Sequence, residues 1–184
     1  MDFTLDKKHE MARQLFKDFA EKEVKPLAQE VDETEHFPEE TVAKMQKIGF
    51  MGIPVPKEYG GQGCDVLTYI MLVEELAKVC GTTSVVVSGH TSLCIDPIMT
   101  YGTEAQKQKY VVPLAKGELL GAFALTEPGA GTDAQGVQTK AVLDGDEWVL
   151  NGSKCFITNG WYADVYIVIA ITDIVEDKRG RKQK

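Results

Sequence analysis

Two segments of this chain bring together the residue types that could bind a flat ligand with a polar edge. The first, Gly121 to Asp133, is an apolar run that enters a glycine-rich turn, and the second, Lys154 to Gly160, combines an aromatic ring with hydroxyl and amide groups. We expect amides and hydroxyls of Leu125, Thr126 and Thr132 to project from the edge of a sheet. Such groups suit the pyrimidine edge of a flavin or the amide groups of a pantetheine arm.

An aromatic residue and a hydroxyl residue stand close together in the second segment. If Lys154 to Thr158 is a strand, Phe156 and Thr158 lie on the same face, because side chains alternate along a strand. The ring could then stack on a flavin while the hydroxyl forms a hydrogen bond to it. From the chemistry alone, a core phenylalanine and a strand-end threonine are the favoured interpretation.

A glycine pattern in the first segment imitates a dinucleotide-binding motif. Gly129 to Ala134 matches G-x-G-x-x-A and follows a predicted strand. That motif requires a helix whose N-terminus points at the pyrophosphate. Here the glycines lead into Thr139 to Gly145, which predicts a strand and a hairpin turn, so we reject the hypothesis of a nicotinamide enzyme.

The elements that must position these segments are helical over the first two-thirds of the chain. Apolar residues recur at helical spacing from Leu5 to Val31, and Pro26 should kink that helix or divide it. Pro38 suits a first helical position, and Gly49 is expected to end the helix that follows. Val42, Met45 and Ile48 are expected to fall on one face of this second helix.

A third helix is predicted to be buried on almost every side. Asp65 can cap it, and its residues from 66 to 79 are apolar except for a short polar edge. We expect that edge to be solvated rather than catalytic, and it consists of Glu74, Glu75 and Lys78.

A fourth helix, from Thr83 to Tyr101, carries small and polar residues in its middle, from Ser88 to Ser92. That interruption suits a helix that lines a pocket and, equally, a close helix crossing. Thr103 to Gln106 is a capping-box pattern, which predicts a last helix that ends near Gly117.

After Gly117 the sequence predicts strands instead of helices. Apolar, alternating or β-branched runs predict them at 119–126, 137–143, 147–150, 154–158 and 165–172, the last of them buried. The predicted fold class is therefore α+β. An all-helical domain would span residues 1–117, and an incomplete antiparallel β domain would span residues 118–184.

Composition and charge argue against several classes of function. The chain has 184 residues and a formal net charge of −8, which argues against nucleic acid or an anionic membrane surface as a partner. No apolar run approaches the ~20 residues of a membrane span, and the N-terminus lacks the pattern of a secretory signal. The cysteines form no C-x-x-C pair and the histidines lack ligand spacing, so we expect free thiols, no metal site and a cytoplasmic protein.

Several segments spread over nearly the whole chain share their order and spacing with a known family: Tyr59–Gly63, Val73–Ala77, Tyr101–Lys107, Phe123–Asp133 and Leu150–Gly160. In them the chain resembles the acyl-CoA dehydrogenases of the short-chain, butyryl-CoA type, and the last two segments are the most specific. The resemblance implies an all-helical N-terminal domain followed by a barrel-like β domain. It also raises the weight of the flavin interpretation over that of a core phenylalanine.

The resemblance implies roles for individual residues as well. The residues that would bind FAD are Phe123, Leu125, Thr126, Phe156 and Thr158. Thr132 would contact the CoA arm, and Leu93 would border the acyl chain. Phe156 stands where many relatives have Trp, and either ring can stack on a flavin.

The family implies α,β-desaturation of a short acyl-CoA, with hydride transfer to FAD and electrons passing to an electron-transfer flavoprotein. Its members continue beyond the region present here, into a helical bundle that supplies the general-base glutamate and most of a tetramer interface. We assign no carboxylate of this chain as that base, and we expect Glu127 to hold the glycine-rich turn. The chain by itself is expected to be inactive, and to be unstable, to associate or to be a fragment. The alternative hypothesis is a non-catalytic acyl-CoA-binding or assembly module built on the helical domain.

Overall fold

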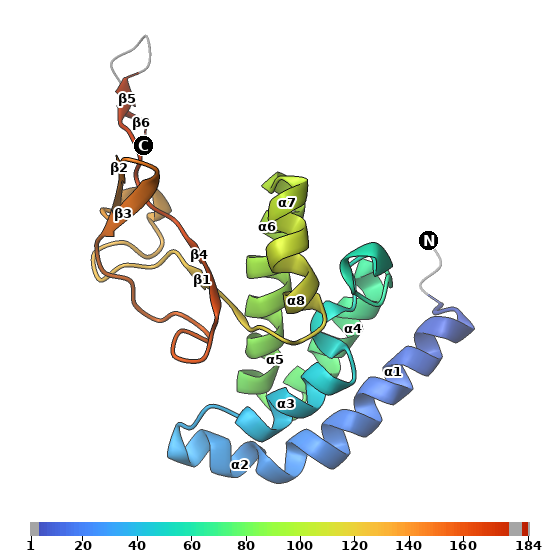
Figure 1. Ribbon diagram of the computed structural model, residues 1–184. Helices are drawn as coiled ribbons and strands as arrows, with labels where there is room; N and C mark the ends of the chain where they lie inside the picture. Colours follow the sequence, from blue (N-terminus) through green and yellow to red (C-terminus); the bar gives the residue numbers. More distant parts are fainter. Residues whose placement is uncertain (1–3, 177–181, 184) are drawn as a thin grey trace.

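The computed structural model describes residues 4–176 and 182–183, with the helices in one group and the strands in another (Figure 1). The α-helices are α1 (Lys7–Phe19), α2 (Lys25–Thr34), α3 (Glu39–Lys47), α4 (Val66–Ala77), α5 (Gly81–Ser88), α6 (Asp96–Tyr101), α7 (Glu104–Gln106) and α8 (Val112–Ala115). Several are joined without a break by π-helical segments at Ala20–Val24, Gly89–Ile95 and Lys107–Val111. Short 3-10 turns lie at Phe50–Gly52, Lys57–Tyr59 and Ala134–Gly136.

Two of the helices begin where the sequence predicts. The Asp65 carboxylate accepts a hydrogen bond from the Thr68 amide at 2.8 Å, and Thr103 and Gln106 form the predicted capping box. Pro26 lies at the start of α2, directly after the π-helical segment Ala20–Val24, so the predicted helix does not separate into two pieces there but changes its hydrogen-bonding pattern just before the proline.

The core of the helical domain lies between α1, α3 and α4. It is built on large, fully buried side chains, among them Phe16, Met45 and Leu72. Ile48, which the sequence places on the same helix face as the buried Val42 and Met45, is 51% exposed. The reason is that α3 ends at Lys47, and the chain turns at Gly49 with φ of 79°.

Helix α4 is less buried than its sequence predicts. Val66, Leu67 and Ile70 are exposed, whereas Glu75, expected on a solvated edge, is buried. Helices α1 and α5 cover two sides of α4 and leave a third side open to solvent. Glu75 lies on the side toward α1, where ion pairs compensate for the burial of its carboxylate.

The strands form pairs rather than one continuous sheet, and the α+β class is confirmed. They are β1 (Gly121–Ala124), β2 (Lys140–Asp144), β3 (Glu147–Asn151), β4 (Val165–Val168), β5 (Val175–Glu176) and β6 (Lys182–Gln183). The β2–β3 and β5–β6 pairs are antiparallel hairpins. The prediction of an antiparallel β domain is wrong for β1 and β4, which pair in parallel, because the long connection between them brings the chain back in the same direction.

The predicted strand at 154–158 is absent. The chain between Asn151 and Val165 contains no strand, and Phe156 has φ of 56°, a left-handed conformation that a strand does not accommodate. One backbone hydrogen bond, from the Cys155 amide to the Thr126 carbonyl at 3.0 Å, holds this segment beside the end of β1. The predicted strand at 165–172 is also shorter, since β4 ends at Val168, and it is only partly buried.

Strand β1 connects the two groups of elements. The helices end at Ala115, and the chain turns at Gly117, where φ is 75°, before β1 begins at Gly121. In Figure 1, β1 and β4 lie between the helices and the β2–β3 hairpin. Of the residues predicted to bind a ligand, Phe123 lies in β1, and Leu125 and Thr126 follow it directly. Leu93 lies in the π-helical segment Gly89–Ile95, which contacts β1.

Candidate functional site

A cavity of about 340 Å³ lies where the helical domain meets the strands. One wall belongs to the π-helical segment Gly89–Ile95, and the others belong to the end of β1 and to residues 156–158. The lining residues are Gly89, Leu93, Phe123, Leu125, Thr126, Phe156, Ile157 and Thr158.

This cavity brings together all but one of the residues singled out from the sequence. The exception is Thr132, which is exposed on the turn after β1 and does not line the cavity. The sequence does not predict Ile157, because alternation along a strand would point it away from Phe156, and the segment is not a strand. Gly89 belongs to the helix interruption that suited either a pocket or a crossing, and it forms part of the cavity wall.

Two glycines permit the close approach of the walls. A Cβ atom on Gly121 would come within 2.6 Å of the Cys94 sulfur, so only glycine lets β1 lie this near the π-helical segment. A Cβ atom on Gly89 would lie 3.3 Å from the Thr158 methyl group. Burial at this junction also raises the pKa of the Cys94 thiol to about 11, which keeps it protonated and unreactive.

The two edges of β1 have different partners. The carbonyls of Leu120 and Ala124 accept hydrogen bonds from the β4 side, so by alternation the odd-numbered residues use the opposite edge. On that edge the Leu125 carbonyl accepts from the Lys154 ammonium at 2.9 Å. Within the described residues, nothing pairs with the amide N–H of Leu125 or with the hydroxyls of Thr126 and Thr158. The cavity is therefore bordered by polar groups that are available to a ligand.

His90 joins the helix wall to β1 from the buried side. Its Nδ1 accepts a hydrogen bond from the Gly121 amide at 2.9 Å, and its Nε2–H donates to the Leu114 carbonyl at 3.2 Å. Burial lowers the pKa of His90 to about 4, and the hydrogen bond to Leu114 opposes this shift. The imidazole is thus a neutral structural link rather than an acid or base.

Glu127 holds the glycine-rich turn, as the sequence predicts. Its carboxylate accepts hydrogen bonds from the amides of Gln138 at 2.6 Å and Thr139 at 2.9 Å, and it pairs with Lys154 at 2.8 Å. The ion pair with Lys154, followed by the contact with Thr139, lowers the pKa of Glu127 to about 2. Such a carboxylate is fully committed to its partners and is a poor general base.

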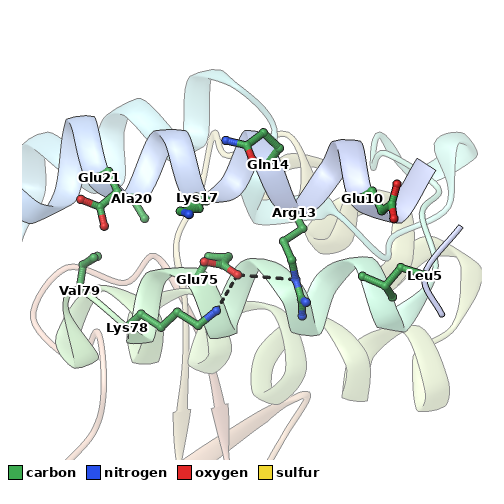
Figure 2. Close-up of a pocket in the computed structure, with 10 residues that line it drawn as sticks. All are labelled: Leu5, Glu10, Arg13, Gln14, Lys17, Ala20, Glu21, Glu75, Lys78 and Val79. Carbon is green, nitrogen blue, oxygen red and sulfur yellow. Dashed lines mark hydrogen bonds and ion pairs between the residues drawn. The ribbon is translucent and has the colours of Figure 1, made fainter. Parts of the chain in front are cut away.

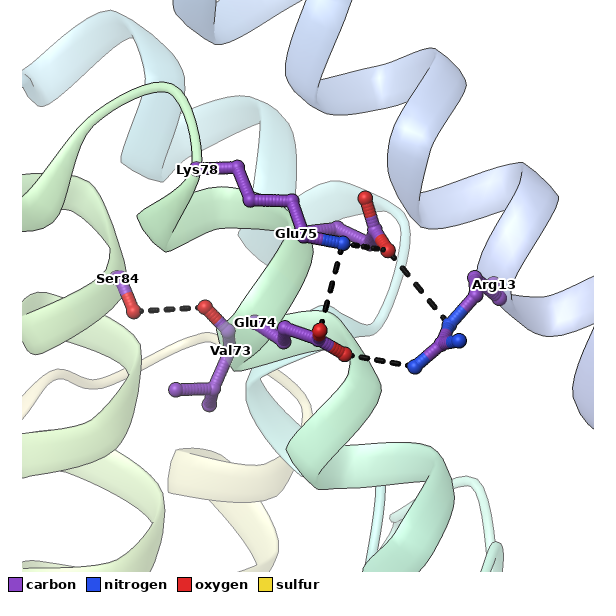
Figure 3. A network of polar contacts seen from close by, with 6 residues as sticks. All are labelled: Arg13, Val73, Glu74, Glu75, Lys78 and Ser84. Atoms are coloured by element: carbon purple, nitrogen blue, oxygen red, sulfur yellow. Dashed lines mark hydrogen bonds and ion pairs between the residues drawn. The ribbon is translucent and has the colours of Figure 1, made fainter. Parts of the chain in front are cut away.

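A second cavity, of about 530 Å³, lies between α1 and α4 (Figure 2). Its charged lining residues are Glu10, Arg13, Lys17, Glu21, Glu75 and Lys78, so cations and carboxylates are equal in number. Figure 3 shows how several of these charges neutralise one another: Arg13 pairs with Glu74 at 2.7 Å, and Lys78 pairs with Glu75 at 2.7 Å. This network joins α1 to α4 and leaves little net charge to attract a ligand.

A larger cavity of about 840 Å³ separates α6 from β4, and Phe123 lines both it and the cavity at Gly89. Across the described ranges, no group of three or more His, Cys, Asp or Glu side chains could hold a metal ion. The thiols of Cys64, Cys80, Cys94 and Cys155 are free, as predicted. None of the described helices combines the length and the hydropathy needed to cross a membrane.

Comparison with known proteins places this geometry in context. Residues 6–118 match the family model "Acyl-CoA dehydrogenase, N-terminal domain", and residues 122–183 match "Acyl-CoA dehydrogenase, middle domain". The chain is 60% identical to the short-chain specific acyl-CoA dehydrogenase of Clostridium acetobutylicum over 180 residues, which are 98% of this chain and 48% of that protein. The chain thus spans about half the length of the curated relatives it matches.

Solved structures agree with the sequence comparison. Butyryl-CoA dehydrogenase from Megasphaera elsdenii matches with a TM-score of 0.88 and 46% identity, over 98% of this chain and 47% of that one. A structure described as the electron transferring flavoprotein of Acidaminococcus fermentans matches with a TM-score of 0.90 and 51% identity, over 94% and 46%. Acyl-CoA dehydrogenase from Bacillus anthracis, complexed with FAD, matches with a TM-score of 0.84 and 37% identity, over 90% and 29%.

Proposed function

The chain belongs to the acyl-CoA dehydrogenase family, and from this premise we propose that it forms the part of a flavoenzyme that binds FAD and a short acyl-CoA. The proposed reaction is α,β-desaturation of the acyl group. The observation that carries the proposal is the cavity at Gly89, which gathers an exposed aromatic ring and several unpaired polar groups.

The residues around this cavity fit a flavin. The Phe156 ring is 94% exposed, so it offers a free apolar face on which a planar ring system can stack. The amide N–H of Leu125 and the hydroxyls of Thr126 and Thr158 offer hydrogen bonds to the polar edge of such a ring. When bound, FAD supplies the acceptor for the hydride that leaves the β-carbon.

The acyl group would lie against the helix wall. Leu93 is 44% exposed and Gly89 lacks a side chain, so together they leave an apolar surface next to the flavin-binding groups. The short-chain specific and butyryl-CoA dehydrogenases among the similar proteins support a short acyl chain. Thr132, on the exposed turn outside the cavity, is proposed to contact the CoA arm, as the family resemblance implies.

The general base is proposed to come from outside this chain. No carboxylate lines the cavity at Gly89, and Glu127 is committed to Lys154 and to backbone amides. Because the curated relatives are about twice as long, we assign the base to the part of their sequence that has no counterpart here. Without a general base, desaturation should be slower by ~10²–10⁴-fold, so the chain alone is proposed to be inactive.

Two partners are part of the proposal. Electrons would pass from the flavin to an electron-transfer flavoprotein, which the description of the neighbour from Acidaminococcus fermentans supports. The complete enzyme is proposed to be a homo-oligomer, and a tetramer in keeping with the family. A non-catalytic acyl-CoA-binding module built on the helical domain is less consistent with a cavity whose walls come from both the helices and the strands.

The test is an absorption spectrum of the purified chain after incubation with FAD and removal of free ligand. Retained flavin bands, with a visible spectrum altered from that of free FAD, are the expected result. Acyl-CoA binding by a chain that remains colourless would favour the non-catalytic module instead. If the chain binds neither ligand, the proposed half-site does not form in these residues by themselves.

A further inference from the structure

Asn159 connects three parts of the molecule that surround the cavity at Gly89. The residue is buried, with 5% of its surface exposed, and its Nδ2 donates to the carbonyl oxygens of Val86 at 3.2 Å and Gly121 at 2.9 Å. Val86 belongs to α5, and Gly121 begins β1. The main-chain carbonyl of Asn159 accepts hydrogen bonds from the amides of Tyr162 and Ala163. One side chain thus joins helix, strand and the segment that carries Phe156 and Thr158.

The chemistry of this position requires asparagine. Both partners are carbonyl oxygens, so the side chain must donate twice, which a carboxylate cannot do. The backbone of Asn159 has φ of 67°, a conformation that asparagine tolerates better than most residues other than glycine. Its Oδ1 is buried and has no hydrogen-bond partner among the described residues. The two hydrogen bonds donated by Nδ2 are therefore the ones that hold the side chain.

The residues that line the cavity just before Asn159 have few contacts of their own. The Phe156 ring is 94% exposed and its backbone is in the left-handed region, so neither holds the segment in place. Thr158 lies with its methyl group against Gly89 of the helix wall. The segment is held before Phe156 by the Cys155–Thr126 backbone hydrogen bond and after Thr158 by the Asn159 side chain. Farther along, the Tyr166 hydroxyl donates to the Gly160 carbonyl at 2.9 Å, and the Tyr162 ring stacks on Phe37. Of these contacts, the Asn159 side chain lies nearest to Thr158 in the sequence.

We propose that Asn159 is a positioning residue that fixes the Phe156 ring and the Thr158 hydroxyl relative to α5 and β1, and so shapes the cavity for the flavin. This inference rests on the proposed function, but the anchoring of residues 156–163 can be measured without any ligand. Asn159 itself does not line the cavity, so its effect on a ligand is transmitted through Phe156 and Thr158.

The test uses Asn159→Asp and Asn159→Gly in the whole chain. The first keeps the size of the side chain but puts a carboxylate against two carbonyls, and the second removes the side chain while permitting φ of 67°. Asn151→Asp is the matched control, because Asn151 is exposed at the end of β3 and the substitution changes the charge equally. Two quantities are measured: amide hydrogen exchange of residues 156–163, and the FAD dissociation constant.

In both Asn159 variants the amide hydrogens of residues 156–163 should exchange faster than in the wild type, whereas exchange in α1 and α4 should be unchanged. Both variants should also bind FAD about tenfold more weakly. The Asn151 control should match the wild type in both measurements. Unchanged exchange at 156–163 overturns the inference. Faster exchange with wild-type FAD affinity also overturns it, since the anchor would not then serve the flavin. A wild type that binds no FAD, with faster exchange in both variants, supports the anchor and contradicts the proposed function.

Discussion

The imidazole Nδ1 of His90 accepts a hydrogen bond from the backbone N–H of Gly121 at 2.9 Å, which ties the helix wall of the cavity to the first residue of β1. The Nε2–H of the same ring donates to the Leu114 carbonyl. An amide can only donate and a carbonyl can only accept, so both contacts together require a neutral ring with its proton on Nε2. Protonation of Nδ1 would break the link to β1.

This arrangement predicts how stability depends on pH. Burial lowers the pKa of His90 from 6.5 to about 4, so the unfolded chain binds this proton more readily than the folded chain. The contribution of His90 to stability is complete above pH 6.5 and is lost as the pH falls from 6.5 toward 4. Between about pH 7.5 and about pH 5, this group should lower the free energy of unfolding by about 2 kcal/mol, measured by urea denaturation.

A variant is needed to isolate the effect of His90, because His9 contributes to the pH dependence of stability with the opposite sign. The hydrogen bond with Asp65 raises the pKa of His9, so its contribution is present below 6.5 and is lost as the pH rises through its folded-state value. His90→Gln removes the titration at His90 and leaves that of His9. The difference between the two proteins should therefore shrink as the pH falls. If the free energy of unfolding falls equally in both proteins as the pH falls, His90 is not held neutral.

A second prediction concerns Glu127, which pairs with Lys154 beneath the glycine-rich turn. Glu127→Gln keeps the length of the side chain but removes the charge, so the variant should unfold at lower urea concentration at neutral pH. The pKa of Glu127 is lowered to about 2, chiefly by Lys154, so its contribution is present above 4.5 and is lost as the pH falls toward 2.

The wild type and Glu127→Gln should therefore differ in the free energy of unfolding at neutral pH and have similar values in acid. Urea denaturation at neutral and at acid pH measures both values. Glu147→Gln, at the exposed start of β3, is the matched control and should behave like the wild type throughout. A difference between wild type and Glu127→Gln that persists in strong acid would mean that the charge of Glu127 is not the cause.

The third prediction separates ligand binding from folding. Phe156 is 94% exposed, so Phe156→Ala should leave the urea midpoint unchanged and raise the FAD dissociation constant about tenfold through loss of stacking. Trp161→Ala is the control, because that ring is 96% exposed and does not line the cavity at Gly89. Fluorescence titration with FAD measures the dissociation constant of both variants, and urea denaturation measures their midpoints. Equal losses in the two variants would place the flavin somewhere other than beside Phe156.

The sequence predicts those parts of the fold that depend on local signals. Caps at Asp65 and Thr103 each involve residues within one turn of a helix, and each is confirmed. By contrast, the burial of Glu75 depends on Arg13, far away in the chain, so its pattern on α4 alone predicts a solvated edge. The parallel pairing of β1 with β4 is equally non-local.

The candidate site shows the same division. Phe156 and Thr158 both line the cavity, but strand alternation is not the reason, because the segment that carries them is not a strand. Only the family resemblance predicts their place in the site. The course of that segment is set by Asn159, whose partners Val86 and Gly121 come from two distant elements. No periodicity within the segment could predict that geometry.

The last prediction uses Gly89 to test whether the π-helical segment is a wall of the binding site. Gly89→Ala should change stability by no more than about 1 kcal/mol, because the preference of helices for alanine over glycine opposes the cost of the tight contact with Thr158. The added methyl group would lie 3.3 Å from the Thr158 methyl, so the cavity narrows and FAD should bind more weakly. Gly81→Ala at the start of α5 is the control, since a Cβ atom there meets nothing within 4 Å. For Gly89→Ala, FAD titration should therefore show weaker binding while the temperature of thermal unfolding stays near that of the wild type, whereas FAD affinity should stay constant for Gly81→Ala. Wild-type affinity in Gly89→Ala would remove the helix wall from the site and leave only the strand side to bind the flavin.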